Sequence, residues 1–186
     1  MTVAPLYARV LRDGWARLAA PVRSIHSAQP VVRAHGRFRV VHGRRRLARV
    51  LARLLRLPPA CASTDTRLTV TAVDAGERWE RTFDVHCLET EQYETDASEL
   101  AEAFGVLELR FRLDALGDSL HYVPRGAALL WGSRRLPIPA RLAPRVEARE
   151  DPAGPRRIDV HVDVTLPVVG PLIAYEGTVE VEDTSA

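Results

Sequence analysis

The chain has 186 residues, of which 46% are hydrophobic and 27% charged, and its formal net charge is +2. This size and composition suit one domain with its own core, and the two cysteines, Cys61 and Cys87, are too few for a disulfide framework. All 26 basic residues are arginine, which excludes chemistry that needs a lysine, and the common nucleotide-binding, metalloprotease, serine-hydrolase and calcium-loop signatures are also missing.

Two helices and one strand are predicted in the first third of the chain. Apolar residues recur at helical spacing from about Val3 to Leu18, with most charged residues off that stripe. Residues Arg37–His42 alternate between polar and apolar, which predicts a strand. A second helix is predicted from Arg44 to Leu57, because its leucines and valine form one broad apolar face and its arginines occupy the other.

The charges are distributed unevenly. Residues 14–64 contain eleven arginines and no Asp or Glu, whereas residues 65–186 contain 23 acidic residues and 13 arginines. Such asymmetry indicates either an anionic partner or a basic helix that packs beside the acidic sheet of the same chain. The wide leucine face of the second helix favours docking on the sheet, and the lack of interleaved aromatic residues argues against nucleic-acid binding.

Beyond Pro59 the apolar residues alternate with a period of two, which predicts antiparallel strands. A short helix is expected around Ser98–Phe104, and an irregular segment between Pro124 and Pro144. The predicted hairpins pair residues 68–72 with 79–85, 107–113 with 119–123, and 158–166 with 173–181.

These elements predict a single α+β domain over residues 1–186, with an arginine-rich helical part at 1–60 and an antiparallel β part at 61–186. About seven strands form a curved, mostly antiparallel sheet or a small barrel with two N-terminal helices, in a helix-grip or lipocalin-like arrangement. Charged residues interrupt the apolar pattern of the first helix, so neither export nor a membrane span is predicted. The chain has only two cysteines, which favours a cytoplasmic location. The oligomeric state stays open.

Six segments across nearly the whole chain carry a family likeness. They are Y-A-R-V-L at Tyr7–Leu11, L-A-R-V-L-A-R-L-L-R-L-P-P at Leu47–Pro59, R-W-E-R-T-F at Arg78–Phe83, E-A-F-G at Glu102–Gly105, L-P-I-P-A-R-L-A-P-R at Leu136–Arg145, and L-P-V-V-G-P-L-I-A-Y-E-G at Leu166–Gly177. Together they resemble an uncharacterised bacterial domain family, found alone or fused behind a nicotinamide-binding domain similar to saccharopine dehydrogenase. The resemblance implies a possible oxidoreductase partner but no activity, since this chain has no nucleotide fingerprint.

A ligand pocket is predicted from aromatic residues and arginines on different strands. Aromatic rings with polar tips suit an amphipathic ligand, although they can equally form a plain aromatic core. Arg81 shares a strand face with Trp79, so a buried guanidinium there needs either a structural ion pair, for which Glu102 is the candidate, or a ligand anion. The candidate ligand-binding residues are Trp79, Arg81, Tyr93, Phe111, Tyr122, Trp131, Arg145 and Tyr175.

His26 is the candidate catalytic residue. It lies in a stretch without carboxylates, near the first helix, and as a general base it needs a substrate proton within hydrogen-bond reach. The row Asp159, His161 and Asp163 on one strand face is interpreted as a solvated surface, so neither a metal nor a cofactor is expected.

Three functions remain open at this point. The first is a domain that binds a hydrophobic or amphipathic, possibly anionic, small metabolite. The second is a cofactor-independent cyclase or isomerase of a biosynthetic pathway. The third is an interaction module for an oxidoreductase, with the arginine-rich helix as its docking surface.

Overall fold

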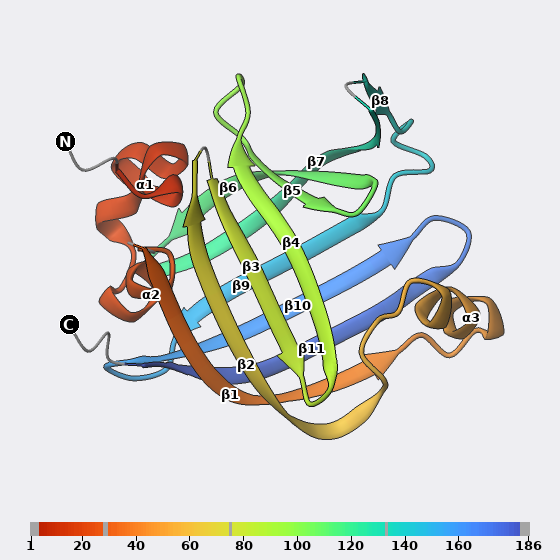
Figure 1. The fold of residues 1–186 in the computed structure, drawn as a ribbon, viewed down its shortest axis with the longest axis horizontal. Helices are drawn as coiled ribbons and strands as arrows, with labels where there is room; N and C mark the ends of the chain where they lie inside the picture. Colours follow the sequence, from red (N-terminus) through yellow and green to blue (C-terminus); the bar gives the residue numbers. More distant parts are fainter. Residues whose placement is uncertain (1–3, 28–29, 75, 133, 183–186) are drawn as a thin grey trace.

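The dominant feature of the computed structural model, which describes residues 4–27, 30–74, 76–132 and 134–182, is one antiparallel sheet of eleven strands closed into a barrel (Figure 1). The strand order is β6-β5-β4-β3-β2-β1-β11-β10-β9-β7, and β7 pairs with β6 to close the ring of ten strands, while β8 extends outward from β7. The bounds are β1 (Val31–His42), β2 (Cys61–Val73), β3 (Gly76–Phe83), β4 (His86–Glu94), β5 (Leu100–Phe104), β6 (Leu107–Leu116), β7 (Ser119–Trp131), β8 (Arg134–Pro137), β9 (Arg145–Pro152), β10 (Arg157–Leu166) and β11 (Gly170–Val181).

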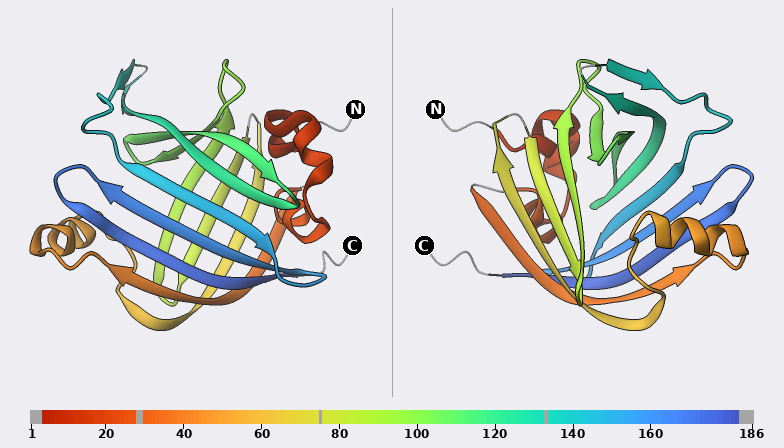
Figure 2. Two further views of the ribbon diagram at one scale, coloured as in Figure 1. Left: turned by 180° about the vertical axis from the view of Figure 1, so that it is seen from behind. Right: turned by 45° about the vertical axis from the view of Figure 1, so that its right-hand side comes forward.

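Helices occupy both ends of the barrel (Figure 2). At one end, α1 (Leu6–Leu11), the 3₁₀ helix η1 (Arg12–Arg17) and α2 (Ala20–Ile25) cover the barrel. At the other end, α3 (Arg46–Leu54) lies between β1 and β2 in the chain. No helix in the described part of the chain is long and apolar enough to cross a membrane.

The predicted hairpins are confirmed by the pairs β2–β3, β6–β7 and β10–β11. The expectation of about seven strands was too low. β4 falls in a polar stretch without clear alternation, and β5 was expected to be helical around Ser98–Phe104. Leu100 and Ala101 are buried where β5 pairs with β4 and β6, so the sheet overrides the local helical preference.

In the segment from Pro124 to Pro144, which was expected to be irregular, residues 124–131 continue β7 and residues 134–137 form β8, whereas residues 138–144 are irregular as expected. Phe111 is opposite Pro124 and Arg110 is opposite Gly126, so Arg125 is the extra residue of a bulge in the β6–β7 ladder. A bulge tolerates proline, which cannot donate a backbone hydrogen bond to a regular ladder. The proline therefore argued against a strand in the sequence, although the bulge allows β7 to continue through it.

The first helix, expected from Val3 to Leu18, is broken into α1 and η1, with residues 1–3 outside the described part. Gly14 lies in η1 and is buried, and its Cα faces Ala115 of β6, so close packing on the barrel accompanies the tighter 3₁₀ turn. His26 follows α2 directly and is fully buried.

The second helix is rotated about its axis relative to the expected orientation, although Leu51 of the expected apolar face still packs against the core. Ala48 and Ala52 are its buried residues, while Leu47 and Leu54 are exposed. Small side chains let the helix approach the barrel closely: the position of a Cβ on Gly43 would lie 3.0 Å from the Ala48 Cβ. The expectation that the leucine face docks on the sheet was therefore wrong.

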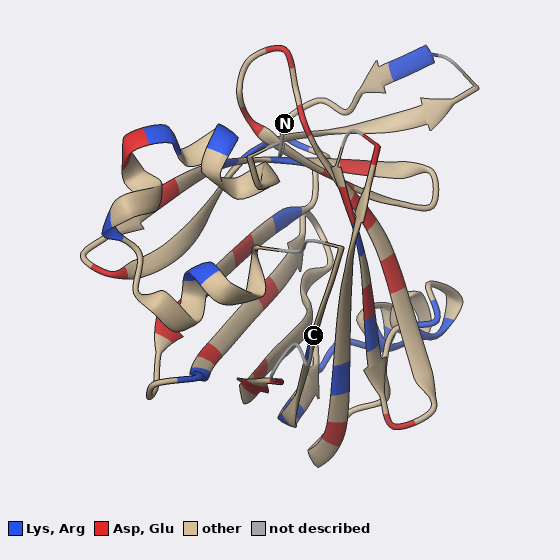
Figure 3. Ribbon diagram, turned by 60° about the vertical axis from the view of Figure 1, so that its left-hand side comes forward, with Lys and Arg blue, Asp and Glu red and all other residues tan. Residues whose placement is uncertain are grey.

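The arginines of the first third behave in two ways. On β1, Arg37 pairs with Asp65 at 2.9 Å and Arg39 pairs with Glu176 at 3.3 Å, so these charges meet the acidic strands. The arginines of α3, seen as blue segments along that helix in Figure 3, are exposed and pair with no carboxylate among the described residues. The arginines of the strand β1 thus pair with acidic residues of neighbouring strands, whereas the expected pairing of the basic helix with the acidic sheet is not found for α3 among the described residues.

Candidate functional site

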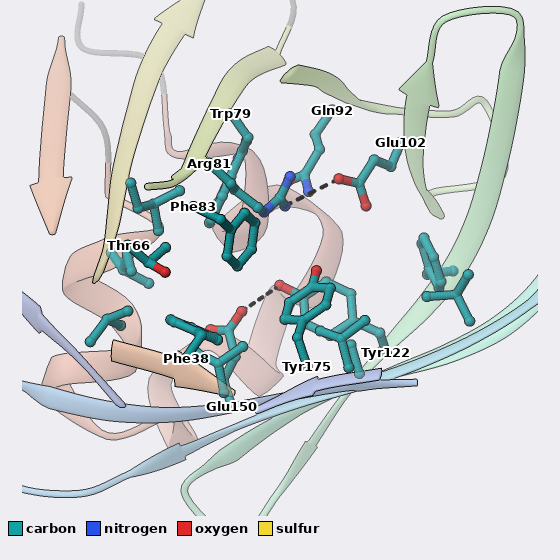
Figure 4. A pocket seen from close by; sticks show the side chains of 18 residues that line it. Phe38, Thr66, Trp79, Arg81, Phe83, Gln92, Glu102, Tyr122, Glu150 and Tyr175 are labelled. Carbon is teal, nitrogen blue, oxygen red and sulfur yellow. Dashed lines mark hydrogen bonds and ion pairs between the residues drawn. The ribbon is translucent and has the colours of Figure 1, made fainter. Parts of the chain in front are cut away.

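An internal cavity of about 90 Å³ lies inside the barrel next to the N-terminal helices; we call it the inner cavity (Figure 4). Alternate residues of each strand point inward, so several strands contribute to its wall. Most of the lining is apolar, with a few polar groups. It is lined by Ile25, Phe38, Thr66, Leu68, Trp79, Arg81, Phe83, Gln92, Glu102, Phe111, Tyr122, Val146, Ala148, Glu150, Val160, Val162, Tyr175 and Val179.

A second cavity of about 150 Å³, the outer cavity, lies toward the end of the barrel that carries α3. Its wall is dominated by aliphatic side chains, including Leu55 and Leu57 after α3 and Leu166 at the end of β10. The two cavities adjoin, because five lining residues belong to both. The shared residues are Arg81, Glu102, Val146, Val162 and Tyr175.

The predicted ion pair between Arg81 and Glu102 is confirmed and lies where the two cavities adjoin. The Arg81 Nη2 donates to Glu102 Oε1 at 3.1 Å, and Nη1 donates to Thr90 Oγ1 at 2.9 Å. Thr90 in turn donates to the same Glu102 oxygen at 2.7 Å. The guanidinium carbon lies 5.0 Å from the centre of the Trp79 ring, within cation–π range.

Both members of this pair are held largely away from solvent, with side chains 17% and 16% exposed. Burial acts to lower the pKa of the Arg81 guanidinium, but the Glu102 carboxylate acts in the opposite direction and the net pKa lies above its usual value. Arg81 therefore stays charged at any physiological pH, and the pair is a fixed dipole at the place where the two cavities adjoin.

A second polar cluster joins the N-terminal helices to the barrel wall. The Tyr7 hydroxyl donates to Gln92 Oε1 at 2.6 Å and lies 3.0 Å from the Tyr122 hydroxyl. Tyr122 donates to Glu150 Oε1 at 2.9 Å, and His26 Nε2 lies 2.7 Å from Glu150 Oε2. Five buried side chains, from α1, β4, β7, β9 and the residue after α2, thus form one network.

His26 does not reach the cavity directly. Its ring is fully buried, stacks on Tyr7 with centroids 3.7 Å apart, and is absent from the lining of the inner cavity. Its Nδ1 is buried without a hydrogen-bond partner among the described residues. A molecule in the cavity would meet Glu150, so the predicted general base could act on it only through that carboxylate.

The buried tyrosines at the site remain protonated. Burial raises the pKa of the Tyr7 and Tyr122 hydroxyls well above the usual value, and the nearby Glu150 charge raises both further. Burial likewise raises the pKa of Tyr175. These side chains therefore serve as hydrogen-bond donors rather than as bases. Among the described residues, no group of three or more His, Cys, Asp or Glu side chains is placed to hold a metal ion.

Glu77 gives a testable pH dependence. It is buried and accepts a hydrogen bond from Trp79 Nε1 at 3.1 Å, and burial raises its pKa, opposed by the charge of His26. The pKa of the Glu77 carboxyl is therefore higher in the folded than in the unfolded state, so the protonated form is favoured by folding. The stability that the protonated carboxyl contributes is complete at low pH and is lost as pH rises through the folded-state pKa.

We therefore expect Glu77→Gln, which keeps an acceptor for Trp79, to be more stable than the wild type at pH 8, with the difference shrinking toward pH 4. Thermal unfolding at the two pH values measures this difference. Glu147→Gln, at an exposed carboxylate, is the matched control and should show no such gain. An equal advantage of Glu77→Gln at both pH values would contradict the prediction.

The structure brings together five of the eight predicted ligand-binding residues, since Trp79, Arg81, Phe111, Tyr122 and Tyr175 all line the inner cavity. The other three lie elsewhere. Tyr93 donates to Glu108 outside both cavities, Trp131 is 77% exposed on β7, and Arg145 is exposed and pairs with Glu147 at 2.8 Å.

Sequence reasoning missed most of the polar groups of the site. Glu150 lies on β9, whose alternation is weak, and Gln92 lies on β4 within a polar stretch. Tyr7 was read only as part of a helix. One usable signal existed: a glutamate at the inward parity of Val146 and Ala148 predicts a buried carboxylate that needs partners.

The comparisons with known proteins give a family and no function. The family model described as "Domain of unknown function (DUF4166)" matches residues 18–179. The comparison with curated proteins and the comparison with solved structures each gave no match. The uncharacterised domain family expected from the sequence is therefore confirmed, whereas the fused saccharopine-dehydrogenase-like domain lies outside this match, and an oxidoreductase partner stays a prediction.

Proposed function

Because the chain belongs to the DUF4166 family, whose description names no activity, we propose a function from the site itself: the barrel binds a small amphipathic metabolite. The polar head of this ligand lies at the Arg81–Glu102 pair, and its apolar part lies in the outer cavity. The position of the pair, shared by the two cavities, supports this arrangement.

The observation that carries the proposal is the buried guanidinium of Arg81. A guanidinium has five N–H groups, and those of Arg81 make two hydrogen bonds within the described residues, to Thr90 and Glu102. Its other three N–H groups have no hydrogen-bond acceptor among the described residues. Buried donors are normally satisfied, so a ligand oxygen or an ordered water is expected there.

Charge balance favours a neutral head over an anion. Glu102 already neutralises Arg81, so an anionic head would have to compete with that carboxylate. A hydroxyl or amide head can accept from Arg81 and donate to Glu102 at the same time. The cavity volumes of about 90 and 150 Å³ are below the roughly 300 Å³ of pockets for drug-sized ligands, which favours a small ligand.

Calorimetric titration with octanamide and octanoate tests this proposal. We expect octanamide to bind the wild type more tightly than octanoate, and the double variant Arg81→Met/Glu102→Leu to bind octanamide about tenfold more weakly, the effect of losing one hydrogen bond to a charged group. Arg145→Met, at an exposed arginine, is the control and should bind as the wild type does. Tighter binding of octanoate would contradict the neutral head, and no binding of either probe would refute the proposed ligand class.

A cofactor-independent isomerase or cyclase is a second candidate, because one observation favours it. The Glu150 carboxylate lines the inner cavity and is backed by Tyr122 and the buried His26, an arrangement that suits proton transfer to a bound metabolite. In this case small molecules that co-purify with Glu150→Gln should be substrate, and those with the wild type product, as identified by mass spectrometry. The same molecule on both proteins would count against catalysis.

A further inference from the structure

The outward face of α3 is apolar, which is unusual for a helix on a globular domain. Leu47, Val50 and Leu54 lie on one side of the helix at helical spacing and are 52%, 49% and 73% exposed. The buried positions of the helix are Ala48 and Ala52 instead. A surface helix normally turns its apolar stripe toward the core, so this stripe lacks a partner within the described part of the chain.

The same segment is strongly basic. Arginines occur at 44, 45, 46, 49, 53 and 56, all exposed, in a region from residue 14 to 64 that contains no acidic residue. Along the helix, Arg46, Arg49 and Arg53 flank the apolar stripe on one side. An apolar stripe beside a cationic stripe is the composition of helices that lie in the interface of an anionic bilayer.

The apolar stripe is continuous with the outer cavity. Leu55 directly follows α3, is 43% exposed, and also lines the outer cavity together with Leu57 and Pro58. Beside the helix, the turn between β10 and β11 exposes Val168, and its carbonyl accepts a hydrogen bond from Arg45 at 2.8 Å. The exposed apolar surface therefore leads from the helix into the barrel interior.

We propose that α3 and the β10–β11 turn form a docking surface for bilayers rich in anionic phospholipid. Leu47, Val50 and Leu54 insert at the boundary between headgroups and acyl chains, and the neighbouring arginines contact lipid phosphates. This docking places the outer cavity at the bilayer surface, from which an amphipathic molecule can enter the barrel. The docking itself does not depend on the proposed ligand.

The pattern fits a bilayer better than a nucleic acid or a protein. Contact with nucleic acid phosphates uses the arginines but leaves the three exposed apolar side chains in water. A protein partner would need acidic residues matched to each arginine around a narrow apolar strip, whereas a fluid anionic surface satisfies both stripes without a fixed pattern.

Flotation of the full chain with vesicles tests the docking surface. We expect binding to vesicles of equal parts phosphatidylglycerol and phosphatidylcholine, and at least tenfold weaker binding to pure phosphatidylcholine. Leu47→Asp/Leu54→Asp and Arg49→Glu/Arg53→Glu should each weaken binding to the anionic vesicles at least tenfold. All four positions are exposed, so these variants should unfold at the wild-type temperature.

The matched control is Leu116→Asp, at a leucine that is 59% exposed at the end of β6, near the N-terminal helices, and it should bind as the wild type does. If Leu47→Asp/Leu54→Asp binds the anionic vesicles as tightly as the wild type, the binding comes from the arginines alone and the proposed insertion is overturned. No binding to either vesicle would overturn docking altogether and assign the surface to a protein partner. The octanamide titration uses no vesicles, so these outcomes leave the proposed ligand binding separately testable.

Discussion

Arg81→Met is expected to lower the free energy of unfolding by about 3 kcal/mol, the lower end of the range for breaking a buried ion pair. The substitution keeps an apolar stem of similar length but leaves Glu102 charged inside the barrel, with Thr90 as its only hydrogen-bond donor among the described residues. An uncompensated carboxylate in an apolar interior is costly, because burial penalises its charged form. Urea unfolding at pH 7 measures the difference.

The double variant Arg81→Met/Glu102→Leu separates the orphaned charge from lost packing. Removing both charges should recover most of the lost stability, since a buried ion pair replaced by apolar groups of similar volume is often neutral. Arg145→Met should change stability by less than about 0.5 kcal/mol, as is usual for exposed positions. A double variant as unstable as the single one would show that the ion pair itself stabilises the barrel.

His26→Ala is expected to cost about 3 kcal/mol, because it removes a fully buried ring and a hydrogen bond to a carboxylate. The Tyr7 ring loses its stacked neighbour, and Glu150 keeps only the bond from Tyr122 among the described residues. Because these groups join the N-terminal helices to the barrel, the loss should appear as earlier release of those helices. Hydrogen exchange of α1 and α2, together with urea unfolding, measures both effects.

His35→Ala is the control for this variant, since His35 is exposed on β1, and it should unfold as the wild type does. If His26→Ala unfolds at the wild-type urea concentration, the network does not hold the helices. Loss of function in His26→Ala would in any case be ambiguous, because fold and chemistry change together. Glu150→Gln preserves the shape of the site and is the informative variant for catalysis.

The sequence pattern predicted the local hairpins and could not predict the closure of the barrel. Apolar and polar residues alternate over 158–166 and 173–181, which indicates that each strand has one buried face. The short turn between the two strands makes them pair with each other. The pairings of β1 with β11 and of β7 with β9 join segments far apart in the chain, and the period-two pattern is the same whichever strand lies alongside. The count of strands and the closed ring follow from those pairings.

The site residues that could be predicted are those that share one face of a single strand. Arg81 shares the inward parity of Trp79 and Phe83, so a buried guanidinium and its partner could be inferred. Glu150 was not found, because its partners come from the residue after α2 and from β7, and proximity across such distances leaves no mark on the local pattern. The leucine face of α3 misled for a related reason: an apolar stripe indicates burial only when a matching surface lies within reach.

The way in which the N-terminal helices close the barrel has a consequence for biosynthesis. Tyr7 and His26 are translated before the residues they contact, since Gln92 and Tyr122 lie 85 and 115 residues after Tyr7 and Glu150 lies 124 residues after His26. On the ribosome the helices must therefore wait, with their apolar side chains unburied, until β9 has emerged. Within this barrel, the helices are synthesised before the strands that bury them and reach their native position after those strands, which exposes their apolar side chains to aggregation in the meantime.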